Sequence, residues 1–132
     1  MRPADVRSIT IDSDAGSVEL VRDLDRWNAS LAAGENTLDG EADPAVVDRL
    51  LDLLSATRAT EVLVQDFPQQ LQVATIVLHG FDGRPLDAVR VARERNAGRW
   101  AFENGVGVLR LFPSSTQLPL VPDDFPVIPV TP

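Results

Sequence analysis

The sequence predicts an α+β fold, in which one long helix over residues 43–60 covers one face of an antiparallel meander sheet. Two observations indicate this class: one segment with a helix start signal and an apolar stripe, and short alternating segments with turn residues on both sides of it. A chain of 132 residues has room for one modest core, so residues 1–112 are expected to form a single domain.

The chain before the helix is predicted to be mostly strand. Side chains alternate in residues 6–12, and residues 14–17 supply a turn. Residues 17–33 are again extended, and the charged stretch at residues 22–26 predicts a bend or a second tight turn within them. The polar, glycine-bearing stretch 34–42 is expected to be an exposed loop. The alternation places Val6, Ser8, Thr10 and Asp12 on one side of the first strand, and Arg7, Ile9 and Ile11 on the other.

The helix is predicted from its start and from its apolar stripe. Asp43 can accept a hydrogen bond from the first turn, and Pro44 has the fixed φ that suits the first helical position. A lone helix of this length is marginal in water, so the stripe needs a sheet or another helix to cover it. The stripe consists of Val46, Val47, Leu50, Leu51, Leu53 and Leu54, with Asp48, Arg49, Asp52 and Ser55 mostly opposite.

After the helix, short apolar or alternating segments bounded by turns continue to residue 112. Residues 86–93 fit a short helix or a strand, and Val89 and Val91 favour the strand. Asn104 and Gly105 form the strongest two-residue turn signal in the chain. The strands predicted in this part are residues 61–65, 73–79, 86–93, 99–103 and 106–112.

Residues 113–132 are predicted to be a proline-rich extended tail or linker. They hold six of the ten prolines, which cannot donate to a sheet ladder and favour an extended path. They are also too apolar to stay freely solvated, so we expect them to pack along their own sheet or to dock on a neighbouring module. The apolar residues are Leu118, Leu120, Val121, Phe125, Val127, Ile128 and Val130.

Composition restricts the function. The chain has no cysteine, which removes disulfides, thiolate nucleophiles and cysteine metal sites, and all 12 basic side chains are arginine. The net charge is −8 and residues 1–66 hold 14 of the 20 acidic side chains, so we expect no nucleic-acid partner. No stretch approaches the roughly 20 apolar residues of a membrane span, so we expect no membrane insertion within this chain.

Candidates for catalytic and metal sites are weak, and we predict no catalytic, cofactor-binding or metal-binding residue. Asp12, Asp14 and Gly16 resemble the start of a calcium loop, but the glycine comes one position early and Asp23 stands where a glutamate would close the loop. His79 is the only histidine, so a Ser-His-Asp triad would have to use it, and a residue at a strand end is the simpler interpretation.

Two pairs of carboxylates are close in sequence. Asp48 and Asp52 lie four residues apart on one helix face, and Asp123 and Asp124 are adjacent. A glycosidase needs two carboxyl groups that face each other across a cleft, whereas the helix pair points in one direction. A solvated helix face is therefore the favoured interpretation, and no glycine-rich phosphate-binding motif is present.

Two further sets of side chains suggest binding. The first is a cluster of arginines around two turns, which would suit an anionic partner if the strands bring them onto one surface, although ordinary polar sheet faces also explain them. The second is a set of aromatic residues in alternating strands, which form either a platform for sugar or simply core. The first set is Arg84, Arg90, Arg93, Arg95 and Arg99; the second is Trp27, Trp100 and Phe102.

The order of the elements also carries a resemblance. An opening ITI strand, a strand bearing Trp27, the segment DPAVVDRLLDLLSATRATEVL and hairpins ending in RWAFENGVGVLRL follow one another over residues 6–112. In this layout the chain resembles the domain-of-unknown-function family four-three-four-zero, although residues 69–72 replace the glycine-leucine turn and proline common there. The resemblance implies a repeated module of membrane-anchored, extracytoplasmic bacterial proteins that are often encoded beside gliding-motility-type ABC transporters.

Two functions from different classes follow. The first is a non-catalytic binding or assembly module that uses its sheet edges and tail to contact other modules of its protein or another protein. The second is a domain that binds a small ligand, sugar or anion, or a hydrolytic domain without a recognisable motif. A pocket that holds His79, a carboxylate and a serine within hydrogen-bond reach would favour the second. We expect no enzyme and no cofactor, and an extracytoplasmic location by the resemblance, with the cytoplasm left open.

Overall fold

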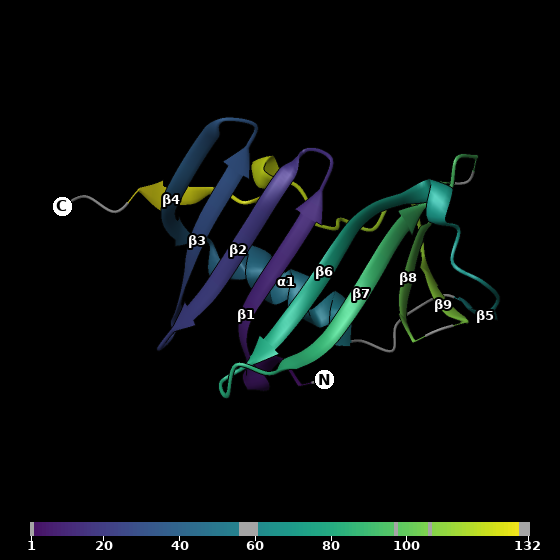
Figure 1. Ribbon diagram of the computed structural model, residues 1–132, viewed down its shortest axis with the longest axis horizontal. Coiled ribbons are helices and arrows are strands. Elements are labelled where there is room, and N and C mark those ends of the chain that lie inside the picture. The colour runs from purple at the N-terminus through teal and green to yellow at the C-terminus, as the bar shows by residue number, and fades with distance from the viewer. Residues whose placement is uncertain (1, 56–60, 97, 106, 130–132) are drawn as a thin grey trace.

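The computed structural model describes residues 2–55, 61–96, 98–105 and 107–129, and these form one open antiparallel sheet with a helix on one face (Figure 1). The sheet has ten strands in the order β10-β4-β3-β2-β1-β6-β7-β8-β9-β5. Its helix-bearing face is the inner face, and the opposite face of β1–β4, β6 and β7 is the outer face. The α+β class and the antiparallel sheet are therefore confirmed.

The first four strands form a meander joined by two-residue turns. They are β1 (Val6–Ser13), β2 (Gly16–Asp23), β3 (Arg26–Ala33) and β4 (Asn36–Ala42). The interruption predicted at residues 22–26 is a tight turn, in which Leu24 has a φ of 58°. The loop predicted over residues 34–42 is wrong, because β4 occupies most of it. Polar residues on the outer side of β4 make its sequence resemble a loop. The strand is formed by pairing with β3 and β10.

The first strand contains an irregularity that changes which side chains face the core. The register of β1 with β6 shifts between Val6 and Ser8, as in a β-bulge, so the alternation slips by one residue there. Val6 is consequently buried together with Ile9 and Ile11, and the predicted placement of Val6 on the side of Ser8 is wrong. Ser8, Thr10 and Asp12 do share the outer face, as predicted.

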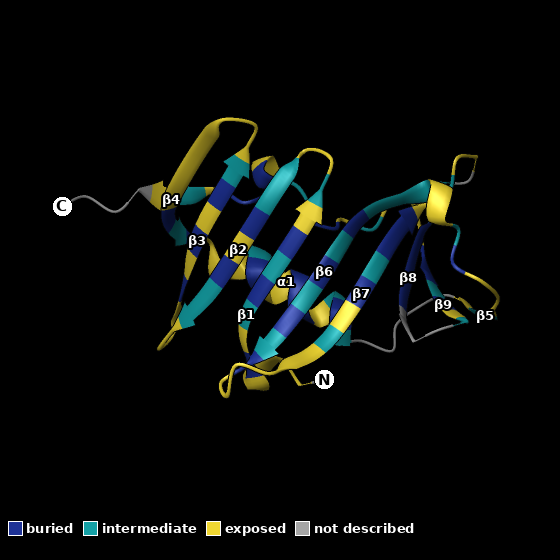
Figure 2. Cartoon of the chain, in the orientation of Figure 1, coloured by how far each residue is buried: buried dark blue, intermediate teal, exposed yellow. Residues whose placement is uncertain are grey.

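The helix α1 (Pro44–Ser55) begins as the sequence predicts. The Asp43 carboxylate accepts a hydrogen bond from the backbone N–H of Ala45 at 3.0 Å, which satisfies a donor of the first turn. The buried stripe consists of Val47, Leu50, Leu51 and Leu54, which join the main core, and Figure 2 shows buried and exposed residues alternating along the helix behind the strands. The predicted continuation over residues 56–60 lies outside the described residues.

The second half of the sheet is a series of hairpins. Its strands are β5 (Glu61–Val64), β6 (Gln72–Gly80), β7 (Pro85–Arg93), β8 (Trp100–Gly105) and β9 (Val108–Phe112). Residues 86–93 are thus strand. The turn predicted at Asn104 and Gly105 is wrong in position, because Gly105 pairs with Val108 and the reversal comes after it. Gly107, whose φ is 82°, takes the left-handed conformation in that reversal.

At the β7–β9 end both faces of the sheet are covered. The side chains of Trp100, Phe102 and Phe112 join the main core on the inner face. On the opposite face, a second cluster forms around Phe67, which is carried by the connection from β5 to β6. This cluster contains Phe67, Ala92, Ala101, Leu109 and Leu111, with Leu63 and Leu71 packed against it.

After β9 the chain returns along the inner face to the far edge of the sheet, where β10 (Val127–Pro129) pairs with β4 (Figure 1). Leu118, Leu120 and Phe125 are buried in the main core, so the described part of the proline-rich segment packs along its own sheet. The close approach of β10 requires Gly40, because a Cβ there would lie 2.5 Å from the carbonyl oxygen of Ile128.

Candidate functional site

A shallow hollow of ≈ 420 Å³ on the outer face brings together polar side chains from three strands. Ser8 and Thr10 of β1 form its centre, because Ser8 lies opposite His79 of β6, and Thr10 lies opposite Glu19 of β2. The turn between β6 and β7 closes one end. The lining residues are Arg7, Ser8, Thr10, Glu19, Val21, His79, Gly80 and Gly83.

The local sequence explains why these groups face outward. In β1, β2 and β6 the alternate positions Ile9, Leu20 and Leu78 are fully buried on the inner face. Their neighbours along each strand must therefore point to the outer face. The alternation in β1 indicated this for Ser8 and Thr10. The predicted placement of Arg7 on the side of Ile9 and Ile11 is wrong, because the register of β1 with β6 shifts between Val6 and Ser8. Glu19 was missed because it becomes a neighbour of Thr10 only through the pairing of β1 with β2.

The polar side chains of the hollow are not used by the protein itself. Within the described part of the chain, no hydrogen bond or ion pair engages the side chains of Arg7, Ser8, Thr10, Glu19 or His79. The hollow thus holds a histidine, a carboxylate and a serine, as a hydrolase would need, but they are not joined as the nucleophile, base and orienting group of a triad are.

The aromatic residues proposed as a sugar platform lie in the core instead. Trp27, Trp100 and Phe102 are 3 %, 9 % and 4 % exposed and face the helix-bearing side of the sheet. Two arginines lie over the indole rings: Arg22 is 4.5 Å from the centroid of Trp27, and Arg93 is 4.4 Å from that of Trp100. No flat aromatic surface is therefore left for a sugar on these residues.

The arginines around the two turns do not form a shared free surface. Arg90 pairs with the buried Glu103 and lies 4.4 Å from the ring centroid of Phe67. Arg93 donates to the carbonyl oxygen of Gly98 at 3.2 Å. Arg84 lies 3.9 Å from Asp82 across the exposed β6–β7 turn. The protein's own acceptors therefore occupy most of this cluster.

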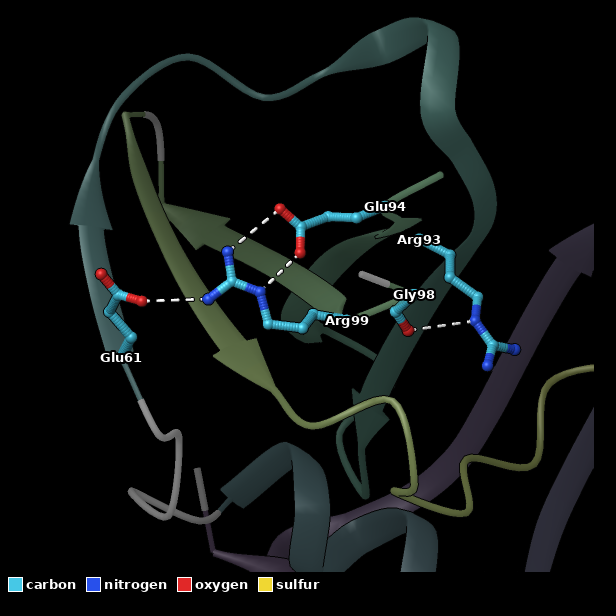
Figure 3. A network of polar contacts seen from close by, with 5 residues as sticks. All are labelled: Glu61, Arg93, Glu94, Gly98 and Arg99. Atoms are coloured by element: carbon cyan, nitrogen blue, oxygen red, sulfur yellow. Dashed lines mark hydrogen bonds and ion pairs between the residues drawn. The ribbon is translucent and has the colours of Figure 1, made fainter. Parts of the chain in front are cut away.

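Arg99 ties three segments together, as Figure 3 shows. Its guanidinium donates to both carboxylate oxygens of Glu94, at 2.6 and 3.2 Å, and to Glu61 of β5 at 3.1 Å. Hydrogen bonding of the Arg99 guanidinium to the Glu94 carboxylate is the main cause that raises the pKa of Arg99, and the hydrogen bond to Glu61 adds to it. The arginine therefore stays charged and holds β5 to the β7–β8 turn, which is a structural role.

Neither of the two carboxylate pairs forms a catalytic arrangement. Asp48 and Asp52 are exposed on the solvent side of α1. Asp124 accepts hydrogen bonds from the backbone N–H groups of Leu120 at 3.0 Å and Val121 at 3.2 Å, so this carboxylate orders the turn before β10. Among the described residues, neither pair faces another carboxylate across a cleft, as a glycosidase would require.

The calcium-like segment is part of a hairpin. Asp12 and Ser13 end β1, the hydroxyl of Ser13 donates to the carbonyl oxygen of Gly16 at 3.1 Å, and Gly16 begins β2. Among the described residues, no group of three or more histidine, cysteine, aspartate or glutamate side chains is arranged to hold a metal ion.

We expect calcium to leave the melting temperature of the protein unchanged, because a ligand stabilises a fold only by binding it. Thermal unfolding with increasing calcium chloride, compared with magnesium chloride at equal ionic strength, measures this. A rise in melting temperature that depends on calcium concentration and disappears in Asp14→Asn would restore the calcium site.

Comparison with known proteins finds no matching family model, no matching curated protein and no matching solved structure. In the part of the chain that the structure describes, no helix is long and apolar enough to cross a membrane.

Proposed function

We propose that this chain is a non-catalytic binding and assembly module of a larger, membrane-anchored extracytoplasmic bacterial protein, and an auxiliary part of an ABC transporter system. The family resemblance suggests the membrane-anchored protein and the transporter system. The open edge of the sheet at β5 supports the role as a binding and assembly module. We infer that this edge accepts a strand from another polypeptide, by the addition of that strand to the sheet.

The backbone of β5 supports this proposal. The N–H of Gln65 donates to the carbonyl oxygen of Gly107 at 3.0 Å, and the antiparallel register continues from there through Leu63 and Glu61. Because hydrogen-bonded and non-hydrogen-bonded pairs alternate in such a ladder, Val62 and Val64 direct their N–H and C=O groups away from β9. β5 is the last strand of the sheet, so among the described residues these groups have no strand to pair with.

The side chains of the same edge are apolar. Val62 is 60 % exposed and Val64 is 89 % exposed, and Val108 of β9 lies opposite Val64. Native edges are commonly protected by prolines, charges or a short strand. Both edge strands are short, with four residues in β5 and three in β10. Prolines mark only the β10 edge, where Pro126 precedes the strand and Pro129 ends it, whereas β5 contains no proline and exposes two valines.

The contrast between the β5 edge and the hollow favours a binding role for this chain over a catalytic one. Catalysis requires a nucleophile, a base and a group that orients the base, joined by hydrogen bonds. The side chains of the hollow make no such chain, whereas the β5 edge already has the geometry that strand addition uses. The occupant we propose is an extended segment of another module or of the partner protein.

A proline at the edge tests the proposal. Val64→Pro removes an N–H that faces away from β9, so the fold should persist, since edge strands tolerate proline at such positions. Strand addition should fail, because the new strand loses a donor and meets the proline ring. We expect the full-length gene product with Val64→Pro to lose its stable association with the rest of its assembly, measured by native mass spectrometry after mild detergent extraction.

Val64→Thr is the matched control, because threonine keeps the β-branched shape and the backbone N–H. It should associate as the unmodified protein does. Equal association of the proline variant, with its fold verified by circular dichroism, would contradict the assembly role of this edge.

A further inference from the structure

The hollow on the outer face lies on β1, β2 and β6, in the middle of the sheet, whereas β5 is at one end. A function of the hollow is therefore independent of the edge proposed for assembly. Its volume of ≈ 420 Å³ falls within the roughly 300–1,000 Å³ typical of sites for small molecules.

The side chains that line the hollow offer both donors and acceptors. Arg7 can only donate, and the carboxylate of Glu19 can only accept. The hydroxyls of Ser8 and Thr10 and the neutral imidazole of His79 can do both. All five side chains are without a hydrogen-bond partner or ion-pair partner in the described part of the chain, so their full capacity remains for a ligand.

Charge decides which class of ligand fits. Arg7 and Glu19 are one cation and one anion, so the lining carries no net formal charge when His79 is neutral. An anion would meet Glu19 and a chain of net charge −8, and a cation would meet Arg7. A neutral molecule avoids repulsion by either charge. If it carries several hydroxyl groups, it can also use the donors and acceptors of the lining, because each hydroxyl donates one hydrogen bond and accepts others.

We propose that this hollow binds a neutral saccharide. The carboxylate of Glu19 accepts from adjacent hydroxyl groups, Arg7 donates to hydroxyl or ring oxygens, and Ser8 and Thr10 contact the sugar from the centre of the hollow. Val21 supplies an apolar contact for the C–H groups of the ring. Gly80 and Gly83 line the hollow, and Phe81 lies between them in the turn. Phe81 is 59 % exposed and is the aromatic residue nearest in sequence to this site.

The site is open, so much of a bound sugar stays solvated and we expect weak binding, with a Kd of about 1 mM. A titration followed by the backbone amide signals of ¹⁵N-labelled protein measures binding of this strength and locates it. The probes are four neutral trisaccharides, built from glucose, mannose, galactose or N-acetylglucosamine, and the comparison compounds are inorganic phosphate and lysine.

We expect at least one trisaccharide to shift the amide signals of β1, β2 and the β6–β7 turn around the hollow. Glu19→Gln and Ser8→Ala should each weaken that binding by about tenfold, because Glu19→Gln replaces a charged carboxylate acceptor with an amide donor and Ser8→Ala removes the hydroxyl group. Asp39→Asn on the same outer face, but outside the hollow, is the matched control and should leave the Kd unchanged.

Several results would overturn the saccharide site. These are no saturable shift with any of the four sugars up to about 20 mM, shifts that map to another surface, stronger binding of phosphate or lysine than of every sugar, or an unchanged Kd in Glu19→Gln. Val64→Pro should bind the sugar as the unmodified protein does, so the saccharide site and the assembly edge can fail separately.

Discussion

Leu50→Ala is expected to destabilise the protein by about 2–5 kcal/mol, and Leu54→Ala by a similar amount. Both side chains belong to the main core, where Leu50 is 0 % and Leu54 is 5 % exposed on the stripe of α1 that faces the sheet. Alanine at either position removes buried methyl groups and leaves a cavity beneath the strands, which close-packed neighbours fill only in part.

Urea unfolding followed by tryptophan fluorescence measures these losses, since Trp27 and Trp100 lie in the same core. Asp48→Ala is the control on the exposed side of the same helix and should change the unfolding free energy by less than about 0.5 kcal/mol. A loss below about 0.5 kcal/mol for Leu50→Ala would mean that the helix does not cover this core.

Deletion of residues 114–132 is expected to abolish cooperative folding. The segment contributes Leu118, Leu120 and Phe125 to the core and pairs β10 with β4. Its Thr116 carbonyl oxygen also accepts the hydrogen bond of the Trp100 indole N–H at 3.1 Å. Loss of three large apolar side chains, at about 2–5 kcal/mol each, approaches or exceeds the whole stability of a typical domain, about 5–15 kcal/mol.

A single substitution tests the same contribution without removing the chain. Phe125→Ala should cost about 3–5 kcal/mol, whereas Ser115→Ala, at an exposed position of the segment, should cost less than about 0.5 kcal/mol. If the protein that lacks residues 114–132 melts at the same temperature as the intact protein, the segment is an inert linker and does not contribute to the core.

Local patterns in the sequence were sufficient for the start and the buried side of the helix and for most strands. Asp43 and Pro44 define the helix start, and the leucine spacing of the stripe defines its buried side, because both signals come from residues within a few positions of each other. Turn residues likewise placed the end of β1, and the charged stretch at residues 22–26 placed the end of β2. These features depend on interactions between residues that are close in sequence, so the sequence alone predicts them.

The features that were missed depend on pairing between distant segments. β4 is strand only because β3 and β10 pair with it, and its exposed Thr37 and Asp39 resemble a loop. The shift near Val6 depends on the register with β6, some 70 positions later in the chain. The hollow has the same origin, since Glu19 and His79 become neighbours only through β1.

The proposed assembly role requires that β5 receive a strand from another polypeptide. The most direct measurement is hydrogen–deuterium exchange of the backbone amides of Val62 and Val64, first in the isolated chain and then in the full-length protein within its native assembly. Both amides face the open edge, so we expect fast exchange in the isolated chain and strong protection in the assembly. Equally fast exchange of both amides in the assembly would contradict the claim.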